Sequence, residues 1–179
     1  MESLTDLTIY LSKPDSTPAR KLKQICWSTQ QAIEGANRVS LWLFDEDKSV
    51  IFCIMCLDEN GEFSNGQLLS EKDFKPYFEF VLSNQILNAG KAREYDATRC
   101  FNDVYFEPLD IQSLLDYIFH LDFEPAGIIC CESVGSVVDW TEQNENSLKR
   151  ISNITSMFFS QDIQTLGTSH DEILNALKE

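Results

Sequence analysis

Two stretches of this sequence are apolar at every position, and they limit the folds that the chain can adopt. Val50–Leu57 is a continuous apolar run, and Ile128–Cys131 is a second, shorter one. A β-strand turns alternate side chains to opposite faces, so these runs predict strands that are covered on both sides. Arg38–Phe44 has the same character, because both of its alternating sets are largely apolar. Helices must therefore cover both faces of one sheet.

Short polar turns separate these strands and predict that neighbours pair antiparallel. Asp45–Lys48 follows the first strand, and Asp58–Gly61 contains Asn-Gly, a strong hairpin signal. A more polar strand is expected at 62–69, and two further strands at 113–120 and 126–134. Hairpin links this short join only antiparallel strands. The sequence thus predicts an α+β fold with an antiparallel sheet of five to six strands and helices on both faces.

Capping patterns and apolar stripes predict helices before, within and after the strands. Ser16–Pro18 supplies a hydroxyl cap and a proline for the first helix. A second helix is expected over Ser70–Gly90, and Trp140–Thr141 begins a long final one. Ser169 and Glu172 predict a capping box and a short terminal helix.

Length and composition indicate one globular domain. The 179 residues are 43% hydrophobic and 24% charged, which is typical of a folded chain. We divide them into an N-terminal arm (1–15), a main domain (16–161) and a C-terminal linker with a short helix (162–179). The net charge of −15 argues against nucleic acid and anionic membranes as partners. No apolar run approaches the roughly 20 residues of a membrane span, and no leader-like segment is seen, so we expect a cytoplasmic protein.

The six cysteines are expected to be reduced and mostly buried, as in cytoplasmic proteins. Cys53 and Cys56 have zinc-like spacing, but residues three apart on a strand point to opposite faces, so no metal site is predicted. Cys100 lies beside Arg99, and a nearby cation lowers a thiol pKa, whereas nearby aspartates oppose this effect. Cys100 is therefore either a reactive thiol or a plain, partly buried loop cysteine.

Motifs for catalysis are missing from the sequence. There is no Gly-x-Ser-x-Gly elbow and no glycine-rich phosphate loop, and the two histidines, His120 and His170, lie far apart. We therefore predict no catalytic residues, no metal and no cofactor.

Small-molecule binding is the sharpest functional hypothesis. The irregular segment Ala92–Pro108 is long enough to cover one face of the sheet as a binding loop. Arg99 would neutralise an anionic ligand, and aromatic rings would stack on a planar one. In the alternative, Trp42 and Phe44 fill the core, and Arg99 pairs with a nearby aspartate. The candidate pocket residues are Trp42, Phe44, Tyr95, Asp96, Arg99, Ser113 and Glu132.

Dimerisation is the second hypothesis, because the last long helix carries more apolar residues than one sheet face needs. Pairing with a second copy would bury the excess, although Asp162 interrupts a clean heptad. A bundle with the first helix is the alternative. We expect a homodimer through Leu148, Ile151, Phe158, Ile163 and Leu166.

Five segments, taken in order, resemble those of GAF domains, which share a PAS-like layout. The match extends over about residues 17–159, and no single piece is diagnostic. The cyclic-nucleotide signature and the cysteine-histidine or Asp-Ile-Pro motifs of bilin-binding members are not found. The segments are Arg38–Leu43, Pro76–Phe78, Tyr95–Ala97, Leu109–Asp116, and Cys131–Gly135 followed by Trp140–Thr141.

The resemblance implies a bacterial sensor that binds a small molecule, with Asp96 at the start of the ligand-side loop. It also implies dimerisation through the terminal helices and an output domain in the same chain or another. That output would be a diguanylate cyclase, a histidine kinase or a transcription regulator. The alternative is a ligand-free module for dimerisation and scaffolding.

Overall fold

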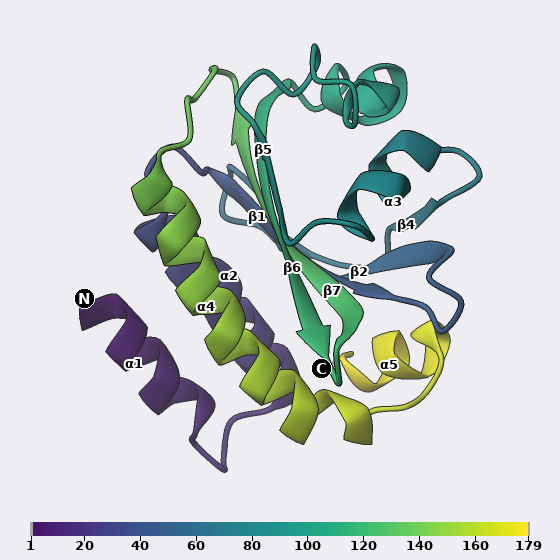
Figure 1. Cartoon of the computed structure of the whole chain (residues 1–179). Helices are drawn as coiled ribbons and strands as arrows, with labels where there is room; N and C mark the ends of the chain where they lie inside the picture. Colours follow the sequence, from purple (N-terminus) through teal and green to yellow (C-terminus); the bar gives the residue numbers. More distant parts are fainter. Residues whose placement is uncertain (1, 179) are drawn as a thin grey trace.

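The structure is a computed structural model that describes residues 2–178. Strands and helices follow one another from an N-terminal helix to a short C-terminal one (Figure 1). The helices are α1 (Glu2–Leu11), α2 (Pro18–Ala32), α3 (Lys75–Val81), α4 (Glu142–Gln161) and α5 (His170–Ala176), with short turns η1 (Arg99–Phe101), η2 (Asn102–Phe106) and η3 (Ile163–Thr165). The strands are β1 (Arg38–Phe44), β2 (Val50–Leu57), β3 (Phe63–Ser64), β4 (Leu68–Ser70), β5 (Ile86–Ala89), β6 (Ile111–Leu121) and β7 (Glu124–Val134).

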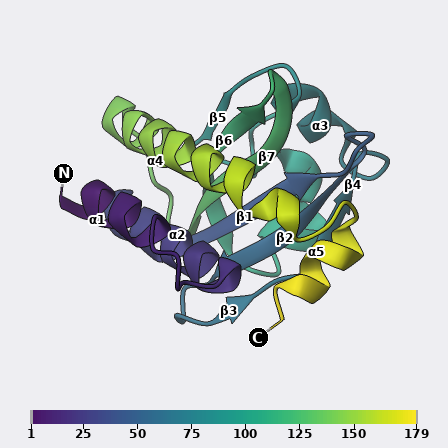
Figure 2. The ribbon, with the colours of Figure 1, turned by 90° about the horizontal axis from the view of Figure 1, so that it is seen from below.

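The seven strands form one antiparallel sheet in the order β3-β2-β1-β7-β6-β5, and β4 also pairs with β2. Helices α2 and α4 pack on one face with α1 outside them, and α5 covers β2 on the same face (Figures 1 and 2). α3 and the chain between β5 and β6 cover the other face. The predicted α+β fold with helices on both faces is confirmed, and the sheet has one strand more than we expected.

The central strands explain why both faces need cover. β1 lies between β2 and β7, and every one of its residues is buried. Val39 and Leu41 face the α2 and α4 side, whereas Trp42 and Phe44 face the α3 side. This alternation follows the predicted pattern. Apolar burial on two faces of one strand is the main stabilising feature of such a three-layer fold.

An extra residue in β2 changes the direction of two cysteines. Leu41 pairs with Met55, whereas the next residue of β1 pairs with Cys53. The register therefore skips Ile54, and such a β-bulge breaks the period of two. Cys53 and Cys56 consequently both face the α3 side. Our expectation that these cysteines would point to opposite faces is wrong for this reason.

The helix that we expected to begin at Ser70 is shorter and is followed by a strand. The Ser70 hydroxyl donates to Asp73 at 2.9 Å, but α3 begins later and ends at Val81. The chain then forms β5, which pairs with β6. Leu87, which we assigned to the helix, is buried by this sheet pairing. A few apolar residues fit a short strand as well as a helical stripe.

Three predicted helix starts are confirmed by their caps. Thr17 accepts a hydrogen bond from the first turn of α2. Thr141 and Asn144 form a reciprocal capping box at α4, and Ser169 and Glu172 form another at α5. Each satisfies backbone N–H groups that have no partner within the helix.

None of the described helices has both the length and the apolar character that crossing a bilayer requires.

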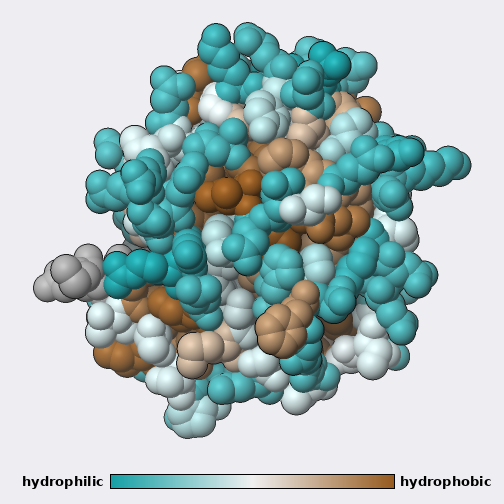
Figure 3. All heavy atoms as spheres, in the orientation of Figure 1, coloured by the Kyte–Doolittle hydropathy of each residue, from teal (hydrophilic) through white to brown (hydrophobic). Residues whose placement is uncertain are grey.

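The residues that we assigned to a dimer interface lie in the chain's own core. α1 packs on α2 and α4 through Leu7 and Leu11, so the expected N-terminal arm is largely a helix. Residues 162–178 return to β2 through Ile173 and Leu177 at the α5 end. Figure 3 shows hydrophilic side chains around the edge of the visible face and hydrophobic ones gathered near its middle. Leu148, Ile151, Phe158 and Ile163 are buried, and Leu166 packs against the same cluster.

Gly127 of β7 leaves room for the ring of Phe119 on the neighbouring strand β6. A Cβ at this position would overlap the ring of Phe119 and the carbonyl oxygen of Trp42. The ring of Phe119 in turn stacks on Phe159 of α4, with centroids 5.0 Å apart. The absent side chain therefore leaves room for the aromatic contact between β6 and α4.

We expect Gly127→Ala to destabilise the fold by at least about 3 kcal/mol, because the backbone carbonyl of Trp42 cannot move aside. Gly61→Ala is the matched control, since a Cβ there meets nothing within 4 Å and only its φ of 82° opposes alanine. That control is expected to cost about 1–2 kcal/mol. Urea unfolding measures both, and equal losses would contradict the steric explanation.

Candidate ligand pocket under the 90–110 segment

Residues 90–110, here called the covering segment, cross the α3 side of the sheet between β5 and β6 (Figure 1). Arg93 joins its two ends. The guanidinium donates to the carbonyls of Ile111 (3.0 Å) and Phe106 (3.3 Å) and to the Asp110 carboxylate (3.1 Å). Asn102 donates back to the Arg93 carbonyl at 2.9 Å. The segment is thus a compact cover held by its own hydrogen bonds, and its π-helical turn η2 is of a kind frequent at functional sites.

An aromatic layer lies beneath the covering segment. The ring of Phe101 stacks on Phe74 at 4.5 Å and meets Tyr77 edge-on at 4.9 Å. Its centroid lies 5.5 Å from that of Phe106 and 6.1 Å from that of Tyr105. None of these rings was among our predicted pocket residues. The available signal was the aromatic content of 92–108, which does not show which rings face inward.

The carboxyl group of Glu132 lies on the sheet beneath this aromatic layer. β1 places Arg38 directly opposite Glu132 of β7, and the two side chains form an ion pair at 3.1 Å. The hydroxyl of Tyr105 donates to the same carboxylate oxygen at 3.3 Å. Burial raises the pKa of Glu132 to about 7, while the charge of Arg38 lowers it. Glu132 therefore has a cation that matches its charge.

Asp116 of β6 has no such cation. Its side chain is fully buried, and the Tyr77 hydroxyl donates to Oδ2 at 2.5 Å. Burial raises the pKa of Asp116 to about 6, against hydrogen bonding by Tyr77 and the weakly donating thiol of Cys130. Within residues 2–178, Oδ1 has no hydrogen-bond partner of good geometry. A buried, unsatisfied carboxylate oxygen of this kind needs an explanation.

These groups surround a small interior cavity. Its volume of about 20 Å³ leaves room for about one water molecule. Its walls are mainly apolar and aromatic, and carboxylate and phenol groups supply the polar atoms. The lining residues are Trp42, Ile51, Leu69, Tyr77, Phe101, Tyr105, Phe106, Leu114, Asp116, Cys130 and Glu132.

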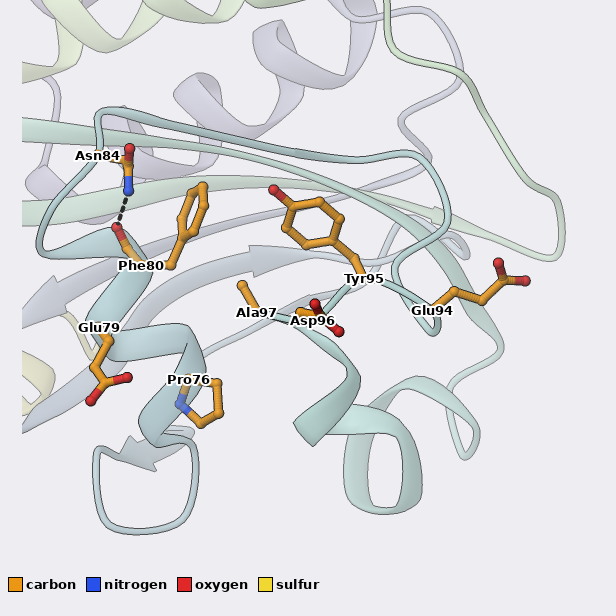
Figure 4. A pocket seen from close by; sticks show the side chains of 8 residues that line it. All are labelled: Pro76, Glu79, Phe80, Asn84, Glu94, Tyr95, Asp96 and Ala97. Atoms are coloured by element: carbon orange, nitrogen blue, oxygen red, sulfur yellow. Dashed lines mark hydrogen bonds between the residues drawn. The ribbon is translucent and has the colours of Figure 1, made fainter.

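A larger groove of about 680 Å³ lies outside, between α3 and the covering segment. Figure 4 shows the rings of Phe80 and Tyr95 side by side in this groove, in an edge-to-face contact with centroids 6.2 Å apart. Asp96 pairs with Arg99 at 3.4 Å, and two glutamates pair with nearby lysines. Because the groove is open and its charges are matched locally, it offers little selective chemistry. The lining residues are Pro76, Glu79, Phe80, Asn84, Glu94, Tyr95, Asp96 and Ala97.

The structure brings four of the seven predicted pocket residues to a cavity, but to two different ones. Trp42 and Glu132 line the interior cavity. The indole N–H of Trp42 donates to Ser40 at 2.8 Å, which leaves its ring as a wall. Tyr95 and Asp96 line the outer groove. The covering segment separates the two places.

The other three predicted residues lie outside both cavities. Phe44 packs edge-on against Phe78 in the core, with centroids 6.3 Å apart. Ser113 is buried and makes hydrogen bonds to backbone groups. The Arg99 side chain is 65% exposed and pairs with Asp96. Phe44 thus fills the core and Arg99 pairs with an aspartate, as in the alternative to a ligand pocket given above.

All six cysteines are free thiols, and only Cys100 is less than fully buried. Burial raises the pKa of Cys56 to about 11 and raises that of Cys53 further. Burial also raises the pKa of Cys100, contrary to the lowering that a neighbouring Arg99 would produce. Across the described residues, no group of histidine, cysteine and carboxylate side chains is placed to hold a metal ion.

Comparison with known proteins identifies the fold. No family model matches this sequence, and no curated protein matches it. Among solved structures, the GAF domain of an Acinetobacter phosphoenolpyruvate-protein phosphotransferase has a TM-score of 0.68 at 12% identity, over 89% of this chain and 91% of that one. The phycocyanobilin-bound GAF domain of a cyanobacterial phytochrome gives 0.69 at 13%, over 92% and 95%. A free methionine-R-sulfoxide reductase from Neisseria meningitidis gives 0.66 at 14%, over 92% and 90%.

These matches define an α+β domain with the layers and strand order of the GAF domains. This chain has the GAF fold, as the resemblance of its segments implied. At 12–14% identity, what the proteins share is the arrangement of helices and strands.

We expect Asp116→Asn to flatten the dependence of stability on pH. The folded pKa of Asp116, about 6, lies above its ordinary 3.8, so wild type loses stability as pH rises through this range. Roughly two pKa units correspond to about 3 kcal/mol. Asparagine still accepts from Tyr77 without the charge, so relative to wild type the variant should gain about 3 kcal/mol between pH 3 and pH 8, and about half of that gain should fall between pH 5 and pH 8.

Urea unfolding at several pH values measures this difference. Glu46→Gln is the control, because Glu46 is exposed in the turn after β1 and its loss should leave the wild-type curve parallel. Glu132, Tyr77, Tyr105, Cys130 and Arg38 remain in both proteins and their effects cancel in the comparison. Parallel curves for wild type and Asp116→Asn would contradict the raised pKa.

Proposed function

We propose that this chain is a regulatory GAF domain that binds a small molecule in its interior cavity and has no catalytic activity of its own. The observation that carries the proposal is buried Asp116, which lines a cavity walled by aromatic rings and whose Oδ1 has no hydrogen-bond partner among the described residues. Buried polar groups are normally hydrogen-bonded, so an unsatisfied one beside a cavity favours a site that a ligand completes. Apolar walls with a few directed polar groups are typical of small-molecule sites.

The cavity must enlarge to accept more than one water molecule, and the covering segment is the part that would move. Phe101, Tyr105 and Phe106 of this segment close the cavity. A ligand would favour the population in which these rings stand away from the sheet. Two structural neighbours support a ligand site in this fold, since one GAF domain is phycocyanobilin-bound and the reductase is in complex with its substrate.

Ser113 offers a route from the covering segment to α4. Its hydroxyl donates to the Gly90 carbonyl at 2.5 Å and accepts from the Val138 N–H at 2.7 Å. Asn88 of β5 donates to the Trp140 carbonyl at 3.3 Å, just before α4. We infer that movement of the covering segment reaches α4 through these bonds. From α4 it would pass to a diguanylate cyclase, a histidine kinase or a transcription regulator, in the same chain or another.

Regulation is proposed in preference to catalysis because of the state of the thiols. The reductase among the structural neighbours raises thiol chemistry as the alternative. Burial raises the pKa of all six cysteines, which opposes formation of the nucleophilic thiolate. The proposed setting is the cytoplasm of a bacterium, with neither nucleic acid nor membrane as partner, and the net charge of −15 supports this choice.

The alternative function is a ligand-free module for dimerisation and scaffolding. The small volume of the interior cavity favours it. The burial of Ile151 and Phe158 within one chain argues against this alternative, because these residues are not available to a second copy. A homodimer therefore remains a prediction that would require other surfaces of the helical layer.

We expect Ile51→Phe to abolish small-molecule binding, because Ile51 lines the interior cavity and a larger ring would fill it. Native mass spectrometry of purified wild type should report a copurified small molecule, and the same measurement gives the subunit number. A screen of metabolites by thermal shift extends the test to ligands lost in purification.

Val104→Phe is the matched control, because Val104 lies on the covering segment but is 66% exposed. This variant should bind like wild type. If wild type carries no bound molecule and no metabolite raises its melting temperature, the scaffolding alternative is favoured instead.

A further inference from the structure

The charges around the interior cavity are not balanced. Glu132 has the guanidinium of Arg38 at 3.1 Å, and that guanidinium also approaches Glu59 at 3.7 Å. Asp116 receives only the Tyr77 hydroxyl and the weak Cys130 thiol, and among the described residues it forms no ion pair. When Asp116 is ionised, the cavity therefore holds one negative charge more than its positive ones.

We propose that the ligand of this cavity is a primary amine, whose protonated nitrogen binds at the unpartnered Oδ1 of Asp116. This inference rests on the proposed function, and it names the chemical class of the ligand. A buried carboxylate without a cation is costly, and an ammonium group supplies both the missing charge and the missing hydrogen-bond donor. Asp116 lines the cavity of about 20 Å³ but its Oδ1 is buried, so an ammonium head would reach this oxygen once the rings of the covering segment move aside.

The walls of the cavity suit a cation as well. Trp42, Phe101 and Tyr105 present aromatic rings to it. The electron-rich faces of such rings attract ammonium groups, most strongly where water is excluded. The apolar remainder of the ligand would take the place of the rings that the covering segment now inserts. Methyl-rich or alkyl chains fit this apolar surrounding better than polar ones do.

The same geometry disfavours an anionic ligand, which our expectation for Arg99 had suggested. Arg99 lies outside the interior cavity and pairs with Asp96. Arg38 is occupied by Glu132 and Glu59. An anion in the cavity would meet the carboxylates of Asp116 and Glu132 without a free cation to offset them.

Protonation of Asp116 and binding of an ammonium group exclude each other at Oδ1, so affinity should depend on pH. Above neutral pH the carboxylate is ionised and affinity levels off. At lower pH it should fall about tenfold per unit once Asp116 is protonated. The other groups facing the cavity are Glu132, Tyr77, Tyr105 and Cys130, and they are common to every protein compared.

The test uses the full chain and four probes at pH 8: n-butylammonium chloride, sodium chloride at equal ionic strength, n-butanol and sodium butyrate. We expect only n-butylammonium to raise the melting temperature saturably, by about 3–6 °C at ten times its Kd. Asp116→Asn should remove this shift while keeping the Tyr77 hydrogen bond. Asp103→Asn, which removes an exposed carboxylate of the covering segment, should leave it unchanged.

Three results would overturn the inference. An equal shift in Asp116→Asn would place the ammonium on the acidic surface. A shift by butanol or butyrate as large as that by butylammonium would show a pocket without the charge preference, and the proposed function would survive. If no probe shifts the melting temperature, a primary amine is ruled out as the ligand. The proposed function is tested separately, by native mass spectrometry of wild type and Ile51→Phe.

Discussion

The antiparallel pairing of β1 with β7 is the constraint on which the rest of the structure depends. Both strands lie inside the sheet, and all of β1 and residues 127–133 of β7 are buried, so polar side chains there need partners within the protein. Arg38 and Glu132 are direct neighbours across this pair, and their opposite charges lie 3.1 Å apart. The pairing thus fixes the central layer and the charged floor of the cavity together.

On the next strand, β6, the buried carboxylate of Asp116 has no cation beside it. Asp116 lies on β6, opposite Cys130 of β7, and a thiol is a poor substitute for a cation. The resulting cost of a few kcal/mol is large against the 5–15 kcal/mol that a domain has in total. The opposite face, where α2 and α4 pack on a mainly apolar cluster, supplies the stability that tolerates it. A fold retains such a cost most readily where the group has a use.

Much of the fold could be predicted because its signals are local. Strands with two apolar faces and helices with hydroxyl caps can be recognised from a few neighbouring residues. Thr17 and Thr141, for example, mark the starts of α2 and α4. The β-bulge at Ile54 has no local signal, since it depends on how β1 and β2 are aligned. β5 has only four residues and gains its burial from β6, so its own sequence resembled the end of a helix. Long-range pairing decided these two features.

The candidate site was predictable only in part, and the residues show why. Trp42 and Glu132 could be found because central strands must face a cover on each side. Asp116 was missed although it stands alone in an apolar run, Leu114–Phe119, where a single carboxylate indicates a buried charge. Arg99 was chosen although aspartates surround it, and such a cation is neutralised locally. An isolated carboxylate within an apolar strand is therefore a better guide to a buried charge without a counter-ion than a charge among opposite ones, because the latter is neutralised by its neighbours.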